Sequence, residues 1–258
     1  MPIYSYSKLS TFEQCQLKFK FRYLDYIQPD FEETIESFLG KKVHKALQWI
    51  YTNSNSNIDK NPELDDVISY FIESWNKDFN HEIKITNSLP VENYFNKGIR
   101  FIINYYTKNY PFKDNTIALE KKIFINLGPE KNYQLIGYID RLVKNENIFE
   151  IHDYKTGYLK SVKDLDNNSQ LALYSLAVKD SFENVEDIFL VWHFLGYNQE
   201  IRSKVILEDL EKLKKNTIEL INKIESTLYF HPNPGKLCNW CEFQSKCPAF
   251  KEYKEKIY

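Results

Sequence analysis

The hydrophobic pattern of the chain changes at Pro111, and this change indicates a mixed α/β fold. Before Pro111, apolar residues recur at helical spacing, and helices are expected at 10–27, 32–51, 62–79 and 91–109. After it, segments rich in β-branched and aromatic residues predict strands at 117–127, 133–143, 148–154, 188–195 and 200–206. Two more helices are expected at 168–179 and 207–228.

The expected domain organisation is a single domain with a mixed central sheet flanked by helices. It comprises a helical part at 1–110, an α/β core at 111–230 and a cysteine-rich tail at 231–258. Ser10 and Glu13 have the spacing of a capping box that would start the first helix. The polar stretch 52–61 predicts a loop, and 128–132 predicts a turn between the first two strands.

Composition excludes several classes of protein. The 258 residues are 43% hydrophobic and 27% charged, which excludes a disordered chain. The formal net charge of -2 gives no overall basic field for nucleic acid. No apolar run reaches the roughly 18 residues of a membrane span, and the N-terminus lacks a secretory signal. We therefore expect a cytoplasmic location and no membrane partner.

Two carboxylates on neighbouring predicted strands form the first candidate site. Asp153 and Lys155 project from the same strand face, because side chains alternate with period two. If Glu146 and Asn147 form a hairpin tip, Asp140 lies opposite Asp153, with Cβ atoms about 4.5–5.5 Å apart. Two ionised carboxylates this close repel each other unless a hard divalent cation binds them. Such a cation would assist phosphate hydrolysis, and Lys155 would position water or neutralise developing charge.

The simpler interpretation of these charges is a solvated hairpin with one salt bridge. Against it, Gly137 and Gly157 flank the charged residues in a chain with only 7 glycines. Their positions indicate close approach of a backbone or a ligand.

Three residues on predicted helices are further candidates. His44 lies beside the apolar stripe of its helix and could offer a metal a neutral nitrogen, or be a packed or surface histidine. Gln170 and Tyr174 are four residues apart and share a helix face. Neither pattern assigns a function by itself.

The four cysteines predict a metal centre. Cys238, Cys241 and Cys247 have C-x2-C-x5-C spacing, and Cys15 lies near the N-terminus. Four thiolates could bind an iron–sulfur cluster or zinc, and buried cysteine without a metal is the remaining interpretation. A centre shared by Cys15 and the tail would staple the two ends of the chain together.

Taken in order, these motifs resemble the RecB-like branch of the PD-(D/E)XK nuclease superfamily. Within it the chain is similar to members with a four-cysteine iron–sulfur cluster, such as CRISPR-associated exonucleases and AddB-type nuclease domains. The residues that carry the resemblance are Tyr6–Cys15, Gly40–His44, Gly137–Arg141, Asp153–Gly157, Gln170 with Tyr174, and the closing cysteine triplet. Two features depart from it: Gln16 stands where many relatives have proline, and 53–111 is longer than in compact CRISPR-associated members.

The resemblance implies a restriction-endonuclease-like fold and metal-dependent hydrolysis of DNA. It implies Mg²⁺ or Mn²⁺ bound by His44, Asp140, Asp153 and the Tyr154 carbonyl, with Lys155 as catalytic lysine and with Gln170 and Tyr174 supporting the site or holding DNA. It also implies a 4Fe-4S cluster, or alternatively Zn²⁺, on Cys15, Cys238, Cys241 and Cys247. Local basic residues expected to follow the phosphate backbone are Lys18, Lys20, Arg22, Lys41, Lys42 and Lys45.

The expected substrate is single-stranded DNA or DNA with free ends, cut by an exonuclease. The processes implied are DNA repair and recombination, phage or CRISPR-related DNA processing, with a helicase or CRISPR-adaptation partner. The alternatives are a catalytically silent DNA-binding or scaffold subunit that retains the fold and cluster, and a zinc-stapled protein of unrelated activity.

Overall fold

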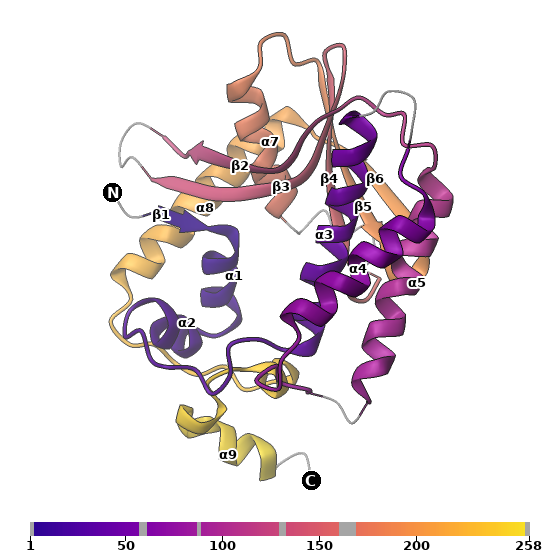
Figure 1. Cartoon of the computed structure of the whole chain (residues 1–258). Coiled ribbons are helices and arrows are strands. Elements are labelled where there is room, and N and C mark those ends of the chain that lie inside the picture. The colour runs from indigo at the N-terminus through magenta and orange to yellow at the C-terminus, as the bar shows by residue number, and fades with distance from the viewer. Residues whose placement is uncertain (1–2, 57–60, 87–88, 129–132, 160–168, 256–258) are drawn as a thin grey trace.

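A computed structural model describes residues 3–56, 61–86, 89–128, 133–159 and 169–255 (Figure 1). Its α-helices are α1 (Tyr6–Gln14), α2 (Gln16–Tyr23), α3 (Ile35–Ser56), α4 (Leu64–Asp78), α5 (Val91–Asn109), α7 (Ser169–Ser181), α8 (Leu207–Ser226) and α9 (Pro248–Glu255). Its strands are β1 (Ile3–Ser5), β2 (Thr116–Asn126), β3 (Gln134–Asn145), β4 (Ile148–Lys155), β5 (Asp187–Phe194) and β6 (Gln199–Lys204). None of the described helices combines the length and the apolar character needed to cross a lipid bilayer.

The strands form one mixed sheet, as the sequence pattern predicts. Its order is β1-β3-β4-β5-β6, and β2 pairs with β3 on the remaining side. The β1/β3 and β4/β5 pairs are parallel, whereas β2/β3, β3/β4 and β5/β6 are antiparallel. The two antiparallel pairs of β3 place β2, β3 and β4 side by side, and these strands carry the acidic residues of the predicted site.

Two hydrophobic clusters hold the helices to the sheet. The first joins the sheet to α1, α2, α7 and α8, and the second packs α3, α4 and α5 together with Tyr154 and Leu195. β4 contributes to both clusters, because Phe149 lies in the first and Tyr154 in the second. Strand β4, which carries Asp153, is therefore fixed by packing from both groups of helices.

Helix α5 lies close to α3 and α4 because of a glycine. A Cβ atom at Gly98 would lie 2.4 Å from Phe71 and 2.9 Å from Leu39, so only glycine fits there without a shift. Figure 1 shows these three helices gathered beside the sheet. The close contact fixes the face that α5 presents toward the ends of the strands.

Two boundary predictions for the N-terminal half are wrong. The first helix begins at Tyr6, where Ser5 is the N-cap and its hydroxyl accepts from the Lys8 N–H at 3.2 Å. Ser10 lies inside this helix and accepts from Gln14 instead of capping it. The helix is also interrupted at Cys15, so the predicted 10–27 helix is two helices and an irregular end.

Part of the predicted 52–61 loop is helical. The polar side chains of Thr52, Asn53 and Ser54 each donate to the backbone carbonyl four residues earlier, at 2.8–2.9 Å. They therefore bond to the helix instead of ending it, and α3 continues to Ser56. Residues 129–132 of the predicted turn lie outside the described residues, as do 57–60 of the predicted loop.

Two short elements were not predicted. β1 has only three residues, too few for a periodic pattern, and it forms by pairing with β3. α9 lies in the tail that the sequence left without regular structure, and Pro248 occupies its first position. Other predicted elements agree with the structure to within a few residues.

Candidate metal and phosphodiester site

The hairpin of β3 and β4 has the predicted register. Asn145 pairs with Ile148 and Arg141 pairs with His152, so the next positions along the two strands are Asp140 and Asp153. The Tyr154 N–H donates to Asp140 Oδ2 at 2.9 Å. The two aspartates are therefore brought together by local strand pairing, as their separation in the sequence predicts.

Helix α3 places His44 against this hairpin. His44 Nδ1 lies 3.4 Å from Asp140 Oδ2, and Nε2 donates to the Tyr154 carbonyl at 2.7 Å. Burial disfavours a charge on His44, but Asp140 outweighs it and raises the pKa of His44 to about 9. Both nitrogens thus face oxygen atoms that are themselves predicted metal ligands.

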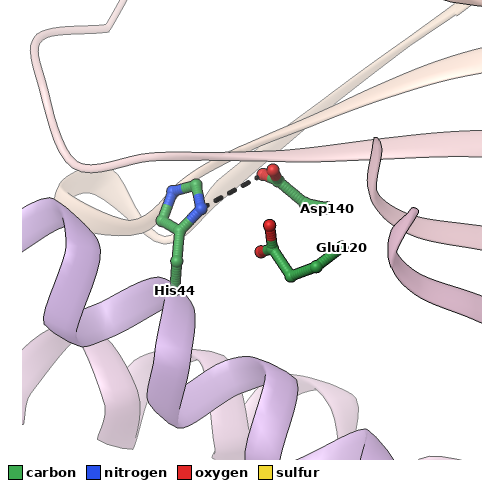
Figure 2. A group of neighbouring side chains, drawn as sticks. All are labelled: His44, Glu120 and Asp140. Atoms are coloured by element: carbon green, nitrogen blue, oxygen red, sulfur yellow. Dashed lines mark ion pairs between the residues drawn. The ribbon is translucent and has the colours of Figure 1, made fainter. Parts of the chain in front are cut away.

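Glu120 on β2 completes a three-residue group that the sequence reasoning missed. Ligand atoms of His44, Glu120 and Asp140 all lie within 4.8 Å of one another, and Figure 2 shows their side chains converging. Lys121 pairs with Ile139 and Leu119 with Arg141, which puts Glu120 opposite Asp140 in the β2/β3 register. Had the turn at 128–132 been used to set this register, Glu120 would have been a candidate from the sequence.

Asp153 adds a buried carboxylate beside this group. Its side chain is 8% exposed, and Oδ2 lies 2.7 Å from Lys155 Nζ, yet forms no hydrogen bond of good geometry within the described part of the chain. Burial and the charge of Asp140 raise the pKa of Asp153, although Lys155 opposes them. Burial, with Asp140, also raises the pKa of Glu120.

This set of ligand atoms fits a hard divalent cation. Two carboxylates and one imidazole converge, and His44 also contacts the backbone carbonyl of Tyr154. The Asp153 carboxylate lies outside this close group, on the strand paired with that of Asp140. These oxygen and nitrogen atoms are of the kind that Mg²⁺ and Mn²⁺ accept. Burial is the main cause of the raised pKa values of Glu120 and Asp153, and the charge of Asp140 adds to it. A bound cation would offset both effects, because it would stabilise the ionised carboxylates.

Gln170 and Tyr174 lie together on α7, as their spacing predicts. Gln170 Nε2 donates to the Tyr174 hydroxyl at 3.3 Å. A Cβ atom at Gly137 would lie 2.3 Å from the Tyr174 ring, so this glycine lets the ring approach β3. Burial raises the pKa of Tyr174, and the charges of Asp153 and Asp140 act in the same direction, although hydrogen bonds from Gln170 and the Tyr138 backbone oppose this rise. The phenol therefore lies near the acidic group.

Most of the predicted phosphate-contacting residues have other partners. Lys18 and Arg22 pair with Glu242 at 2.9 and 2.5 Å, and Lys41 pairs with Glu33 at 2.8 Å. Lys20 lies 3.6 Å from Asp25. Lys42 is buried and pairs with Asp78, so its prediction as a backbone contact is wrong.

Lys45 differs from the other five basic residues in having no ion-pair partner within 4.0 Å in the described part of the chain. Together with Lys41, His44 and Glu120, it lines a cavity of about 350 Å³. Lys45 is thus beside the acidic group, where its ammonium could reach a phosphate bound at that group.

The four cysteines line one cavity of about 240 Å³ where the tail meets α1 and α2. The Leu17 N–H donates to the His231 carbonyl at 3.1 Å, and Asn233 Nδ2 donates to the Gln14 carbonyl at 2.9 Å. The tail therefore lies against the first two helices, as a staple would require. Among the described residues, no three cysteine sulfurs lie within 4.8 Å of one another.

Comparisons with known proteins agree with this architecture. The sequence profile described as the PD-(D/E)XK nuclease superfamily matches residues 3–248. A crystal structure from Eubacterium rectale described as "Putative exonuclease" is similar with a TM-score of 0.53 and 12% identity, covering 96% of this chain and 86% of that one. The structure of SSO0001 has a TM-score of 0.35 and 15% identity, covering 83% and 96% of the two chains.

No curated protein matches the chain. The profile match, however, spans nearly the whole chain and includes both acidic strands and α7. The chain belongs to the PD-(D/E)XK nuclease superfamily.

Proposed function

We propose that this protein is a Mg²⁺- or Mn²⁺-dependent deoxyribonuclease. The observation that carries the proposal is the convergence of His44, Glu120 and Asp140 beside the Asp153–Lys155 pair. When bound, a divalent cation supplies Lewis-acid activation of the attacking water and the scissile phosphate. His44, Glu120, Asp140, Asp153 and the Tyr154 carbonyl are the groups that would hold it.

Lys155 has a separate role in this proposal. Its ammonium lies 2.7 Å from Asp153 and is the cation closest to that carboxylate in the described residues. Lys155 Nζ would orient the attacking water and neutralise charge developing on the phosphate. Gln170 and Tyr174 support the acidic strands from α7, with the Tyr174 ring packed on Gly137.

The proposed substrate is DNA with a single-stranded or free end, degraded exonucleolytically. The fold similarity to the Eubacterium rectale protein described as "Putative exonuclease" supports this choice. The proposed cellular process is DNA repair and recombination, phage DNA processing or CRISPR-related DNA processing. The proposed partner is a helicase or a CRISPR-adaptation protein.

A 4Fe-4S cluster is the proposed occupant of the cysteine cavity. The four cysteines line one cavity where the tail meets α1 and α2, which supports a centre that all four would bind. The resemblance of their spacing to that of the iron–sulfur members favours the cluster, and Zn²⁺ is the alternative. Iron analysis and visible absorption of protein purified without oxygen test the assignment.

The nuclease proposal is tested with end-labelled single- and double-stranded DNA in the presence and absence of Mn²⁺. We expect metal-dependent cleavage that Asp153→Asn and Lys155→Ala each reduce by at least about 100-fold, with the fold retained. Lys179→Ala on α7 is a control, since this exposed lysine lies in the last turn of the helix, about 13 Å along its axis from Gln170. Wild-type rates in both pure site variants would disprove the assigned site.

A further inference from the structure

A groove beside the acidic site is not explained by the chemistry above. Its cavity has a volume of about 820 Å³ and is lined by α5, by the segment that follows β4, by Tyr197 and by Trp240 of the tail. Thr156, Gly157 and Tyr158 line it directly after the catalytic-motif residue Lys155. The groove therefore begins where β4 ends.

The groove adjoins the cavity that contains the metal-binding group. Gly40 lines the cavity of His44 and Glu120, and Thr156 lines the groove. A Cβ atom at Gly40 would lie 3.3 Å from Thr156 Oγ1, so the two cavities meet at this contact. A chain lying in the groove can thus continue past Gly40 to the acidic group.

One wall of the groove is polar and basic. Asn93, Asn96, Lys97 and Arg100 are exposed, and spacings of three and four residues put them on one face of α5. In the described residues, neither Lys97 nor Arg100 has an ion-pair partner within 4.0 Å, unlike the basic residues of α2. This wall can bind phosphates without first breaking an ion pair.

Among the described residues, one carboxylate lines the groove. Glu36 accepts hydrogen bonds from Thr86 at 2.8 Å and from Tyr94 at 3.1 Å. Its carboxylate therefore accepts hydrogen bonds from neutral donors at the first turn of α3. The two cations of α5 outnumber it, so the described part of the lining has a net positive charge.

The rest of the lining presents aromatic rings to solvent. Tyr158 is 88% exposed, Tyr197 46% and Trp240 37%. Large aromatic side chains are usually buried, and three of them around one basic groove form stacking surfaces. Bases stack on such rings, with little dependence on sequence.

We propose that this groove binds single-stranded DNA and leads its backbone to the acidic site. The proposal rests on the nuclease function proposed above and assigns its substrate path. Lys97 and Arg100 contact phosphates, the two asparagines contact sugar or base edges, and the three rings stack unpaired bases. A duplex is excluded from this role because its bases are already paired and stacked within the helix.

The test measures binding of a fluorescein-labelled oligothymidylate of about 16 nucleotides and of a blunt hairpin duplex. All proteins carry Asp153→Asn so that no DNA is cut, and anisotropy is recorded from about 50 to 200 mM salt. Lys97→Gln/Arg100→Gln removes the basic wall, and Lys77→Gln/Lys108→Gln is the charge-matched control outside the groove. Tyr158→Ala removes a ring, and Tyr158→Phe retains it.

We expect the basic-wall variant to weaken single-strand binding and to lower the salt slope of log K by about 1.4, for two lost phosphate contacts. Tyr158→Ala is expected to raise the dissociation constant by at least about fivefold, and Tyr158→Phe to leave it unchanged. The Lys77/Lys108 control should bind as the parent protein does. Equal melting temperatures of all variants show that the fold is retained.

Three results would overturn the proposal: no binding of the single strand by the parent protein, unchanged binding by both groove variants, or equal losses on the duplex. The nuclease function is judged separately, from cleavage by the protein with Asp153 intact. Cleavage with unaffected groove variants would leave the nuclease function standing and remove the groove assignment. Groove-dependent binding without cleavage would support the groove assignment and remove the nuclease function.

Discussion

At the scale of single residues, His44 would connect the proposed metal binding to pH. Its pKa of about 9 means that the imidazole is protonated at neutral pH in the metal-free protein. Ligation by His44 would require the neutral ring, so metal binding would release this proton. The raised pKa also stabilises the metal-free fold: this contribution is complete below pH 6.5 and is lost as the pH rises through about 9.

We therefore predict that apparent Mn²⁺ affinity increases with pH, by up to about tenfold per pH unit between 7 and the pKa of His44. Isothermal titration calorimetry in buffers of different ionisation enthalpy measures both the affinity and the released proton. His44→Gln should bind Mn²⁺ more weakly and lose the His44 part of this pH dependence. An unchanged slope in that variant would show that His44 is not a ligand.

Gly137 is a second residue whose role follows from its surroundings. Gly137→Ala would place a Cβ atom 2.3–2.9 Å from two ring carbons and the hydroxyl oxygen of Tyr174, whose side chain must then move. We expect a loss of about 1–3 kcal/mol in the free energy of unfolding, measured by chemical denaturation. Gly157→Ala is the matched control, because a Cβ atom at Gly157 meets nothing within 4 Å and should leave stability nearly unchanged.

At the scale of elements, β3 and β4 are held to α5 by a buried polar network. The Arg141 side chain is 2% exposed; its Nε donates to the Tyr154 hydroxyl at 3.1 Å, and another nitrogen pairs with Asp114. The Tyr154 and Tyr105 hydroxyls lie 3.2 Å apart. Burial, together with Arg141, lowers the pKa of His152 well below its usual value, which keeps this imidazole neutral.

Tyr154→Phe separates this structural network from the proposed chemistry. The change leaves Arg141 and Tyr105 with one fewer partner, and we expect about 1–3 kcal/mol lower stability by chemical denaturation. Cleavage should persist below the melting transition, because the proposed ligand at this position is the backbone carbonyl. Lost cleavage at unchanged stability would instead assign the phenol to the reaction.

At the scale of the whole molecule, the tail joins the two ends of the chain and also supplies a groove wall. Glu242 pairs with Lys18 and Arg22. Trp240, which lies between Cys238 and Cys241 in the sequence, lines the groove. Figure 1 shows the tail beneath α2 and α3. Anything that releases the tail is therefore expected to affect both stability and DNA binding.

We predict that Cys241→Ser loses iron, melts at a lower temperature and is cleaved by protease within the tail. Because Trp240 moves with the tail, single-strand affinity should fall as well. Metal content, thermal melting, limited proteolysis and anisotropy are measured on the same preparation. A variant without iron that melts and resists protease like the parent would rule out the staple.

Glu242→Gln is the comparison for that experiment. It weakens the ion pairs to Lys18 and Arg22, which join the tail to α2, but leaves all four thiols in place. We expect iron to be retained and the melting temperature to fall less than in Cys241→Ser. Equal losses in both variants would mean that the ion pairs, and not the cysteines, hold the tail.

The sequence by itself determined the order of helices and strands from α3 to α8, and it determined the Asp140–Asp153 pairing. Both depend on local information: periodicity within a segment, and a short turn that sets the register of two adjacent strands. The same local logic would have identified Glu120. The motifs also placed the chain in its superfamily, because their order along the chain can be recognised without knowing how the elements pack.

Only the tertiary structure decided which charges remain unpaired and where the groove lies. Lys18 and Arg22 meet Glu242 more than 200 positions away, and Lys97 and Arg100 face Thr156–Tyr158 because α5 packs on α3 and α4 through Gly98. Such contacts depend on how whole helices and strands pack against one another. This packing depends on the shapes of the side chains in contact, and the periodicity of a single segment does not predict those shapes.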